Sequence, residues 1–458
     1  DIVTVKESLS KDPSLRECET TFEAEGPSGE RGEVTGALLH LAANLGLKAT
    51  VEALLDGGVD ANIPTTGSLG SFKGWARGST ALMLAAAAPD ALEAAKVLVG
   101  APGILPNAQS RDHTTALMWA ALRGNDEVVS LLVDIEGIDV NVVHLYRRDS
   151  ALMSAAKLGY PKVVSSLLSA KGLNVNLVGK YDQTPLICAA EKGHAEVVSL
   201  LVKAEGIQLN SFDVDHKTAL IHAAEKGHSE VASSLLSANG IDVNLLDQES
   251  KSALMLAASA PHTQVVKVLL GHKDIQVNFQ NKKQKSALAM AAENCHTEVV
   301  PLLLKHKDID VNLQTEDKTT ALMLTAMNGH EEVIKIFSDF AKESVDVNLQ
   351  NKDGMTALML GAGKGSYEAT PTTIPTTTTK ATRVARRDRP PPVAGQLSLS
   401  LPESSQDQVV VSAQRKRTEN WQIQTPVETK LLPIDRRFVH SAFWRCKHTD
   451  SPHRISTC

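Results

Sequence analysis

One short phrase returns along most of this chain at a nearly constant interval. Ser or Thr is followed by Ala or Pro and then by Leu, and successive starts are 34 to 36 residues apart. The nine starts are Thr80, Thr115, Ser150, Thr184, Thr218, Ser252, Ser286, Thr320 and Thr356. A tenth, degenerate copy starts at Ala37. Because a fixed period of this length marks a solenoid of stacked units, the chain is predicted to offer an extended recognition surface and no catalytic pocket.

The unit that starts at Thr184 indicates how each copy folds. The Thr184 side-chain oxygen can accept a free backbone N–H at a helix start, and Pro185 takes the first helical position, where no N–H is needed. Small alanines then allow another helix to approach, and Gly193 ends the first helix. The following EVVSLLV places apolar residues at helical spacing. We therefore expect two antiparallel helices per unit.

An asparagine closes each unit, 26 residues after the threonine in the case of Asn210. The corresponding residues are Asn62, Asn107, Asn141, Asn176, Asn244, Asn278, Asn312 and Asn348. A short polar side chain can bond the local backbone of a turn and tolerates left-handed geometry. The next Ser or Thr usually lies eight positions after this asparagine, a spacing that suits a β-turn or hairpin finger.

At this level of detail the units resemble ankyrin repeats. The family pattern, roughly TPLHxAAxxGHxxVVxLLLxxGADVN, is matched by ALLHLAA from Ala37, TPLICAAEKGH from Thr184, TALIHAAEKGH from Thr218 and TALMLTAMNGH from Thr320. The resemblance covers residues 37–365, about ten units. It implies an all-α solenoid of stacked antiparallel helix pairs with β-turn or hairpin fingers, and it implies protein partners.

The units depart from the family pattern in their turns. Most carry one extra residue before the closing asparagine, as in GIDVN. The glycine two positions before the Ser or Thr survives only as Gly78 and Gly354. Its replacements are His113, Arg148, Asp182, His216, Ser250, Gln284 and Lys318. We therefore expect these fingers to be less tightly turned.

The array is bounded by two segments of different composition. Residues 1–36 are polar, and we expect them to be disordered or to form a partial cap. Residues 366–458 contain a Thr/Pro-rich run and basic clusters and are predicted to be a disordered tail. The last unit reads Ala369-Thr370-Pro371 where a second helix should continue, so the tail is interpreted as an alternative or mistaken continuation of a longer array, or else as a basic tail for nuclear import or nucleic-acid contact.

Charge and composition narrow the class of partner. The net charge is −6, but residues from 365 onward carry 14 Lys/Arg against 8 Asp/Glu, which leaves −12 on residues 1–364. An acidic array with 16 aromatic residues in the whole chain is poorly suited to phosphate backbones and base stacking, so nucleic acid is not expected to bind it. No run of about 18 apolar residues predicts a membrane span. Five scattered cysteines favour an intracellular setting, cytoplasm and/or nucleus, and we expect a monomer.

Candidate binding residues lie in one insertion, on the fingers and on the first helices. The insertion at 63–79 is interpreted either as a flexible loop or as an aromatic-tipped binding finger. A stripe two positions after each phrase leucine is expected to line a concave wall or simply to be packed: Leu84, Trp119, Ser154, Cys188, His222, Leu256, Met290, Leu324 and Leu360. The full set of candidate protein-binding residues is Phe72, Trp75, Arg77, Arg111, His113, Trp119, Arg123, Tyr146, Arg148, Tyr181, Asp182, Asp215 and His216. Trp119 with Arg123 is the favoured hot spot.

No pattern in the chain predicts a catalytic, cofactor or metal site. Histidines that recur once per unit after the turn glycine are interpreted as structural; they are His194, His228, His296 and His330. Cys446, His448, His453 and Cys458 have no structural zinc spacing. The function predicted from the sequence is a protein-binding scaffold or adaptor; the alternatives are the targeting part of a larger enzyme and a mechanical spacer.

One residue, Pro301, lies inside the expected second helix of its unit. Proline there removes a backbone hydrogen bond and crowds the preceding turn, at a cost of up to ~3 kcal/mol unless the helix starts late. A weak point is therefore predicted near residues 296–306.

Overall fold

The computed structural model describes residues 19–25, 31–69, 78–340, 344–363, 396–399, 409–415 and 421–424. The chain divides into two compact units, Asp1–Thr377 and Thr378–Cys458. The first unit contains the repeated phrases. The second contains one antiparallel sheet of three strands, β4 (Gln396–Leu399), β5 (Val409–Arg415) and β6 (Trp421–Gln424).

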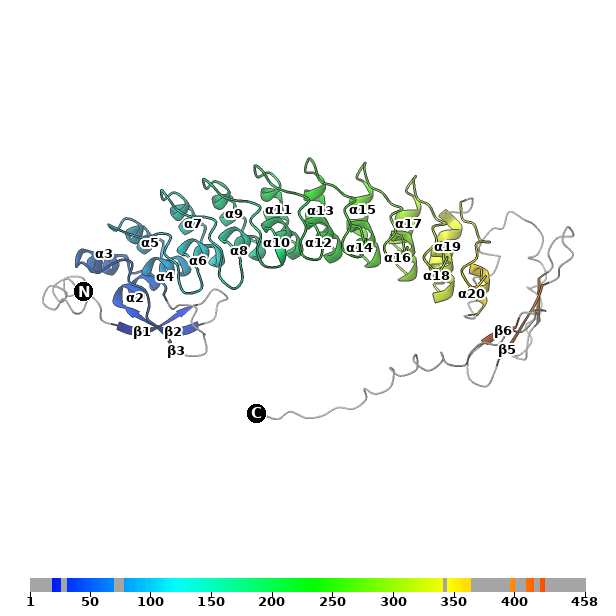
Figure 1. Cartoon of the computed structure of the whole chain (residues 1–458), viewed down its shortest axis with the longest axis horizontal. Coiled ribbons are helices and arrows are strands. Elements are labelled where there is room, and N and C mark those ends of the chain that lie inside the picture. Colours follow the sequence, from blue (N-terminus) through cyan, green and yellow to red (C-terminus); the bar gives the residue numbers. More distant parts are fainter. Residues whose placement is uncertain are drawn as a thin grey trace, which may run out of the picture. The chain divides into compact units, whose positions relative to one another are not determined.

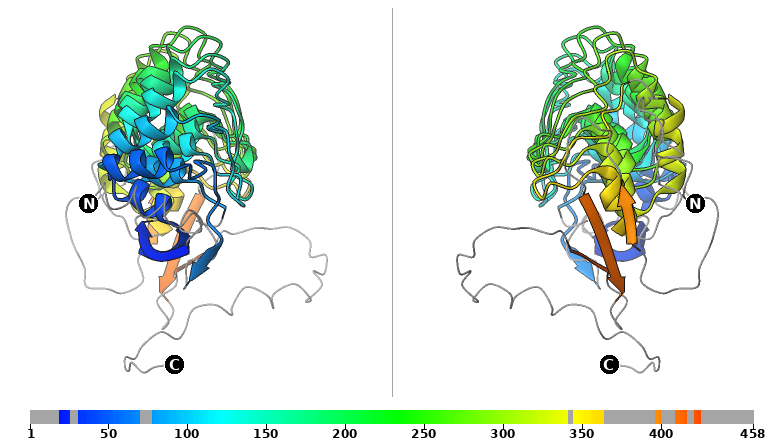
Figure 2. Two further views of the ribbon diagram at one scale, coloured as in Figure 1. Left: turned by 90° about the vertical axis from the view of Figure 1, so that its left-hand side faces the viewer. Right: turned by 90° about the vertical axis from the view of Figure 1, so that its right-hand side faces the viewer.

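The first unit is a row of helix pairs, as the phrase predicted (Figure 1). The first helices of the pairs are α2 (Leu38–Asn44), α4 (Ala81–Ala87), α6 (Ala116–Arg123), α8 (Ala151–Leu158), α10 (Pro185–Lys192), α12 (Ala219–Lys226), α14 (Ala253–Ser259), α16 (Ala287–Glu293), α18 (Ala321–Asn328) and α20 (Ala357–Gly363). The second helices are α3 (Lys48–Asp56), α5 (Leu92–Val99), α7 (Asp126–Val133), α9 (Pro161–Leu168), α11 (Ala195–Leu201), α13 (Ser229–Leu236), α15 (Thr263–Leu270), α17 (Val299–Leu304) and α19 (Glu331–Phe340). Viewed along the row, the successive pairs lie one behind another (Figure 2).

The phrase residue caps each first helix. From Thr80 to Thr356, the Ser or Thr side-chain oxygen accepts the backbone N–H three residues on, at 3.2 to 3.5 Å. Gly193 then ends α10 in the left-handed conformation, with φ 81°. Both ends of α10 therefore follow the expectations from the sequence.

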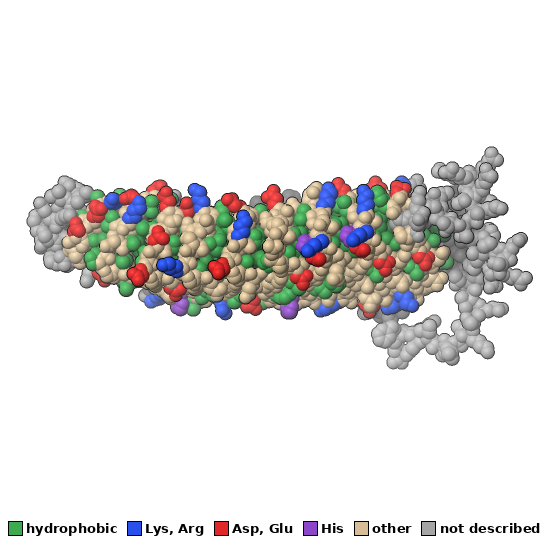
Figure 3. Space-filling view, turned by 90° about the horizontal axis from the view of Figure 1, so that it is seen from above, with side chains coloured by type: hydrophobic (Ala, Val, Ile, Leu, Met, Phe, Trp, Pro, Cys, Tyr) green, Lys and Arg blue, Asp and Glu red, His purple; other side chains and the backbone are tan. Residues whose placement is uncertain are grey.

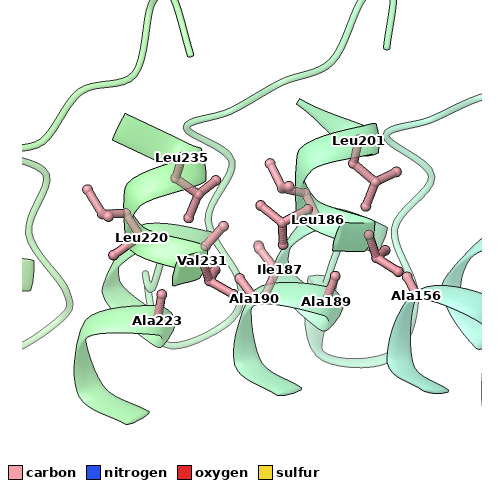
Figure 4. Packing of buried hydrophobic residues seen from close by; sticks show 14 of the residues in the cluster. Ala156, Leu186, Ile187, Ala189, Ala190, Leu201, Leu220, Ala223, Val231 and Leu235 are labelled. Atoms are coloured by element: carbon pink, nitrogen blue, oxygen red, sulfur yellow. The ribbon is translucent and has the colours of Figure 1, made fainter. Parts of the chain in front are cut away.

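Small side chains let neighbouring first helices pack closely. Ala190 and Ala223 are fully buried between α10 and α12, and Ala189 is buried on the side of α10 that faces α8 (Figure 4). Leu186 and Leu220 fill the space beneath the second helices. The same pattern continues through the whole array, so its core is one unbroken apolar layer. Burial of one leucine in such a layer contributes about 2 kcal/mol.

The closing asparagines connect neighbouring units, which differs from the local turn bond expected. Asn210 Nδ2 donates to the Gly240 carbonyl oxygen at 2.9 Å, and Asn210 Oδ1 accepts the Asp242 N–H at 3.0 Å. Both partners belong to the next unit. The pair of bonds recurs for every closing asparagine from Asn62 to Asn312, at 2.7 to 3.0 Å.

The recurrent histidines also connect units, which confirms their structural interpretation. His228 Nε2 donates to the Glu191 carbonyl oxygen at the end of the preceding first helix, at 3.2 Å. Its ring also lies against Gly193, where an added Cβ would come within 2.8 Å of the ring. The glycine and the histidine of the next unit therefore fit each other.

Pro301 is accommodated by a late helix start. α17 begins at Val299, three residues after His296, whereas α11 and α13 begin directly after His194 and His228. Pro301 is therefore in the first turn, where an N–H has no partner within the helix. The predicted cost of up to ~3 kcal/mol allowed for such a late start. The predicted weak point near residues 296–306 stays a prediction.

Strands precede the helical array and enter the insertion. β1 (Glu19–Glu25), β2 (Arg31–Ala37) and β3 (Gly67–Leu69) form an antiparallel sheet in that order, and both β1 and β2 contact α2. An all-α array with β-turn or hairpin fingers was expected, and residues 1–36 were expected to be disordered or a partial cap. The described part of that segment is thus a hairpin against the first helix; whether it acts as a cap stays a prediction. The bulk of the predicted tail at 366–458 lies outside the described residues.

Candidate functional site

The fingers, which run from each closing asparagine to the next phrase, are as tightly turned as a glycine would make them. Non-glycine residues two positions before the phrase adopt left-handed φ angles of 52° to 60°, namely His113, Arg148, Asp182, His216, Ser250, Gln284 and Lys318. Gly78 and Gly354 have φ 81° and 72° at the same position. The expectation of looser fingers was therefore wrong. The turn is imposed by its surroundings, and a residue with a side chain carries the strain.

A short polar side chain holds many of these turns. Asp213 Oδ1 accepts the N–H groups of Asp215 and Lys217, both at 2.9 Å, and its Oδ2 bonds His222 Nε2 at 2.7 Å. Asp247, Asn281 and Asn351 accept the same two backbone N–H groups, while Ser110 and Thr315 accept one. The sequence signal was a short polar residue five positions before the phrase, and it was overlooked.

Two neighbouring fingers are built differently. In the finger at 143–149, His144 Nδ1 accepts the N–H groups of Tyr146 and Arg147 at 3.2 and 3.1 Å. Burial first, and then the positive charge of Arg147, lowers the pKa of His144, so the ring is neutral at pH 7 and can accept these bonds. In the finger at 178–183, a short 3₁₀ turn (Lys180–Asp182) places Tyr181 in the left-handed region, with φ 61°.

Adjacent fingers contact one another through their backbones. The Leu145 N–H donates to the Asp112 carbonyl at 2.9 Å, and the Val214 N–H donates to the Tyr181 carbonyl at 3.1 Å. Between these two contacts, Gly179 lies so close to the Arg148 carbonyl that an added Cβ would be 3.1 Å from its oxygen. The fingers from residue 110 to 217 therefore form a continuous ledge.

Exposed apolar side chains gather on three of these fingers. Tyr146 is 69% exposed and Tyr181 is 58% exposed. Together with Leu145, Val178, Phe212 and Val214 they are called the three-finger patch. The described residues of the later fingers, 245–251, 279–285 and 313–319, contribute no exposed large hydrophobic side chain.

Rings and cations lie beside one another on the patch. Lys180 Nζ is 4.8 Å from the centre of the Tyr181 ring. The rings of Phe212 and His216 are 5.6 Å apart. Aromatic rings next to cations are typical of residues that dominate protein interfaces.

The candidate residues predicted from the sequence divide into three groups. Phe72, Trp75 and Arg77 lie outside the described residues, so both interpretations of the insertion stay predictions. The exposed group is Arg111, His113, Tyr146, Arg148, Tyr181, Asp182, Asp215 and His216, all on the ledge. Trp119 and Arg123 form the third group, on α6.

The favoured hot spot at Trp119 needs correction. Trp119 is only 1% exposed, and Arg123 is half-buried with its Nε donating to the Ala87 carbonyl at 3.2 Å. The first-helix position that carries Trp119 faces into the stack, so a large ring there is packed and cannot meet a partner. The sequence did not show how deeply that position is buried. For the same reason the exposed apolar side chains of Leu145, Val178, Phe212 and Val214 were missed.

The rest of the first-helix stripe is also packed. Leu84, Ser154, Cys188, His222, Leu256 and Leu324 are buried, and Met290 and Leu360 are half-buried. Burial raises the pKa of the Cys188 thiol to about 12, so it stays protonated and unreactive at neutral pH. The packed alternative for this stripe is therefore confirmed.

In the described segments, no group of three or more His, Cys, Asp or Glu side chains is placed to hold a metal ion. Cys446, His448, His453 and Cys458 fall outside those segments. Within the same segments, every helix is too short or too polar to cross a membrane.

Comparison with known proteins identifies the repeats. A family model described as ankyrin repeats in three copies matches residues 39–144, 82–179, 152–247, 235–315 and 307–371. Among solved structures, the ankyrin-repeat domain of Bcl-3, whose title calls it a unique member of the IkappaB protein family, is 24% identical over 48% of this chain and 97% of its own, with a TM-score of 0.44. The ankyrin-repeat protein EF0377 is 21% identical over 42% of this chain and 97% of its own, with a TM-score of 0.40. A search of curated proteins returned no match.

Proposed function

The chain belongs to the ankyrin-repeat family, and from this premise we propose that it is a protein-binding scaffold whose partner contacts the fingers. Repeats of this kind generally mediate protein–protein interaction. The observation that carries the proposal for this chain is the ledge, on which exposed aromatic and charged side chains lie on backbones bonded from finger to finger. A rigid surface of this kind loses little conformational freedom when a partner binds.

The surface charge supports a protein partner over a nucleic acid. On the face seen from above, acidic and basic side chains alternate along the array without a field of one sign (Figure 3). Residues 1–364 carry a formal charge of −12, from the counts of charged residues. We further propose an intracellular, monomeric protein that binds its partner without catalysing a reaction.

Affinity purification of the full chain, with mass spectrometry of what it captures, tests the proposal. We expect at least one protein to be retained in stoichiometric amount and to bind the purified chain directly in calorimetry. Retention of nucleic acid alone would contradict the protein-binding scaffold. Retention of no macromolecule at all would also contradict it and would favour the spacer. Turnover of a substrate by the purified chain would contradict a purely binding role.

The alternative that the chain is the targeting part of a larger enzyme can be tested with the full-length transcript. That transcript would encode a catalytic domain joined to the repeats. A transcript that ends without such a domain would remove this alternative and leave the scaffold.

A further inference from the structure

We propose that the three-finger patch binds an acidic protein segment that presents apolar side chains between its carboxylates. This inference rests on the proposed function and adds the place and the chemistry of the partner. The patch is Leu145, Tyr146, Val178, Tyr181, Phe212 and Val214.

The distribution of exposed apolar side chains singles out these fingers. The fingers that follow are closed by polar groups: Gln280 Nε2 donates to the Gln284 carbonyl at 2.7 Å and to the Gln314 carbonyl of the next finger at 2.9 Å. Gln314 repeats this arrangement. The fold therefore allows a polar finger surface, and the apolar side chains of the patch are not required to build the turn. Exposed apolar groups that gather without a structural need mark an interaction site.

The patch is held rigid from below. Its three fingers contact one another at Gly179 against Arg148 and at Val214 against Tyr181. The Asp213 carboxylate is bonded to two backbone N–H groups and to His222. A partner would meet side chains on a preformed backbone, so the ordering cost of binding is low.

Charge at one end of the patch selects an acidic partner. Arg147, Arg148 and Lys180 are exposed, and none of them forms an ion pair with any residue that the structure describes. The neighbouring carboxylate of Asp149 is already paired with Lys157 at 2.5 Å. Unpaired cations beside tyrosine rings match carboxylates flanked by apolar side chains.

The exposed carboxylates of the same fingers argue against binding of a nucleic-acid phosphate backbone. Asp182 and Asp215 are exposed on the same fingers and would repel a continuous line of phosphates. A short acidic segment can place its carboxylates at the cationic end and its apolar side chains over Tyr181 and Phe212. The patch therefore favours a protein segment in which acidic and apolar side chains alternate.

Selection from a random 16-residue phage-displayed peptide library on the full chain tests the proposal. We expect enriched peptides in which Asp or Glu lies next to Leu, Phe or Trp. One variant, Tyr146→Ser/Tyr181→Ser/Phe212→Ser, should weaken the binding of these peptides at least tenfold, because interface aromatics each contribute more than about 1 kcal/mol. A second, Arg147→Glu/Arg148→Glu/Lys180→Glu, should weaken it similarly and reduce its dependence on salt.

Lys282→Glu/Lys283→Glu provides the control, since it reverses two exposed charges on a later finger. Binding should change less than twofold, and circular dichroism should show that all variants keep their helices. Three results would overturn the proposal that the patch binds an acidic segment. The enriched peptides could lack acidic residues, or no selected peptide could be sensitive to the serine variant. Alternatively, a DNA or RNA oligonucleotide could compete with the peptides. Self-association that the serine variant abolishes in light scattering would also overturn it, in favour of a second copy.

The test separates the patch from the general function. If affinity purification captures a protein equally well with the wild type and the serine variant, the scaffold stands and the three-finger patch falls. If no protein is captured at all, both fall.

Discussion

The closing asparagine of each unit shows how one side chain can join two units. Its amide donates with Nδ2 and accepts with Oδ1, so a single residue satisfies one carbonyl and one N–H of the following unit. Aspartate could not donate and serine could not reach both groups. The position of this residue was predictable from its spacing, but its role was not, because spacing along the chain does not reveal which backbone groups of the next unit lie opposite.

Removing one such connection should weaken the array measurably. Asn210→Ala deletes two hydrogen bonds, each worth about 1 kcal/mol, and should lower the free energy of unfolding by about 2 kcal/mol. Urea unfolding followed by circular dichroism measures the change. Asn239→Ala, at an exposed residue of the following unit, is the control and should cost less than ~0.5 kcal/mol. Equal effects of the two substitutions would contradict the connecting role.

The buried thiol of Cys188 predicts a pH dependence of stability. Its pKa is raised by burial from 9.0 to about 12 in the folded chain, so the folded state keeps a proton that the unfolded state releases. This contribution is complete below pH 9 and is lost as the pH rises from 9 towards 12, by at most ~1.4 kcal/mol per pH unit. The wild type should therefore lose stability more steeply than Cys188→Ala between pH 9 and 10.5 in urea unfolding. Parallel curves for the two proteins would refute this assignment.

At the scale of the element, helices were easier to predict than fingers. A first helix such as α10 is delimited by its own residues, the capping Thr184 and the terminal Gly193, and both signals are local. The conformation of a finger depends on the fingers beside it, which is why His216 or Gln284 adopts the geometry of the missing glycine. The late start of α17 at Pro301 is an intermediate case. The proline can be recognised in the sequence, but whether the neighbouring units accommodate a helix that starts late depends on the fold.

Strain in the fingers should be relieved by glycine. Gln284 has φ 52°, a conformation that costs a residue with a Cβ about 1–2 kcal/mol, against about 0.5–1 kcal/mol of extra chain entropy for glycine in the unfolded state. Gln284→Gly should therefore stabilise the array by ~0.5–1 kcal/mol. Gln284→Ala keeps the Cβ and should give no gain. Thermal unfolding of the two variants compares them directly, and a gain from alanine equal to that from glycine would exclude backbone strain as its source.

Pro301 offers a second test at this scale. Lys267 occupies the equivalent position in α15, which begins directly after His262. Pro301→Lys restores an N–H and should allow α17 to begin near Thr297, with slower hydrogen exchange at residues 297–302. The gain in stability should be below ~1 kcal/mol, because the proline already lies in the first turn. Unchanged exchange in the variant would show that the late start has another cause.

At the scale of the whole array, each unit touches only its neighbours, so stability and binding have different origins. Stability comes from a repeated interface of alanines and leucines that the period made predictable. The binding surface comes from residues that the repeat leaves free, and Trp119 and Tyr146 show the difference. Both are aromatic, but only the position within the unit decides that the first is buried and the second is exposed. The sequence identified part of the ledge, and the depth of each position required the structure.

A stack held by nearest neighbours should separate where one interface is weakened. Leu220 is 1% exposed in α12, in the middle of the array, and Leu220→Ala should cost about 2–5 kcal/mol. Because units on either side retain their own interfaces, we expect unfolding in urea to split into two transitions, with hydrogen exchange in α12 and α13 accelerated first. Leu358→Ala in α20, the last described helix, removes a half-buried side chain and should loosen only that end in a single transition. One cooperative transition for both variants would mean that coupling extends well beyond adjacent units, and a partner bound across several fingers would then stabilise the array as a whole.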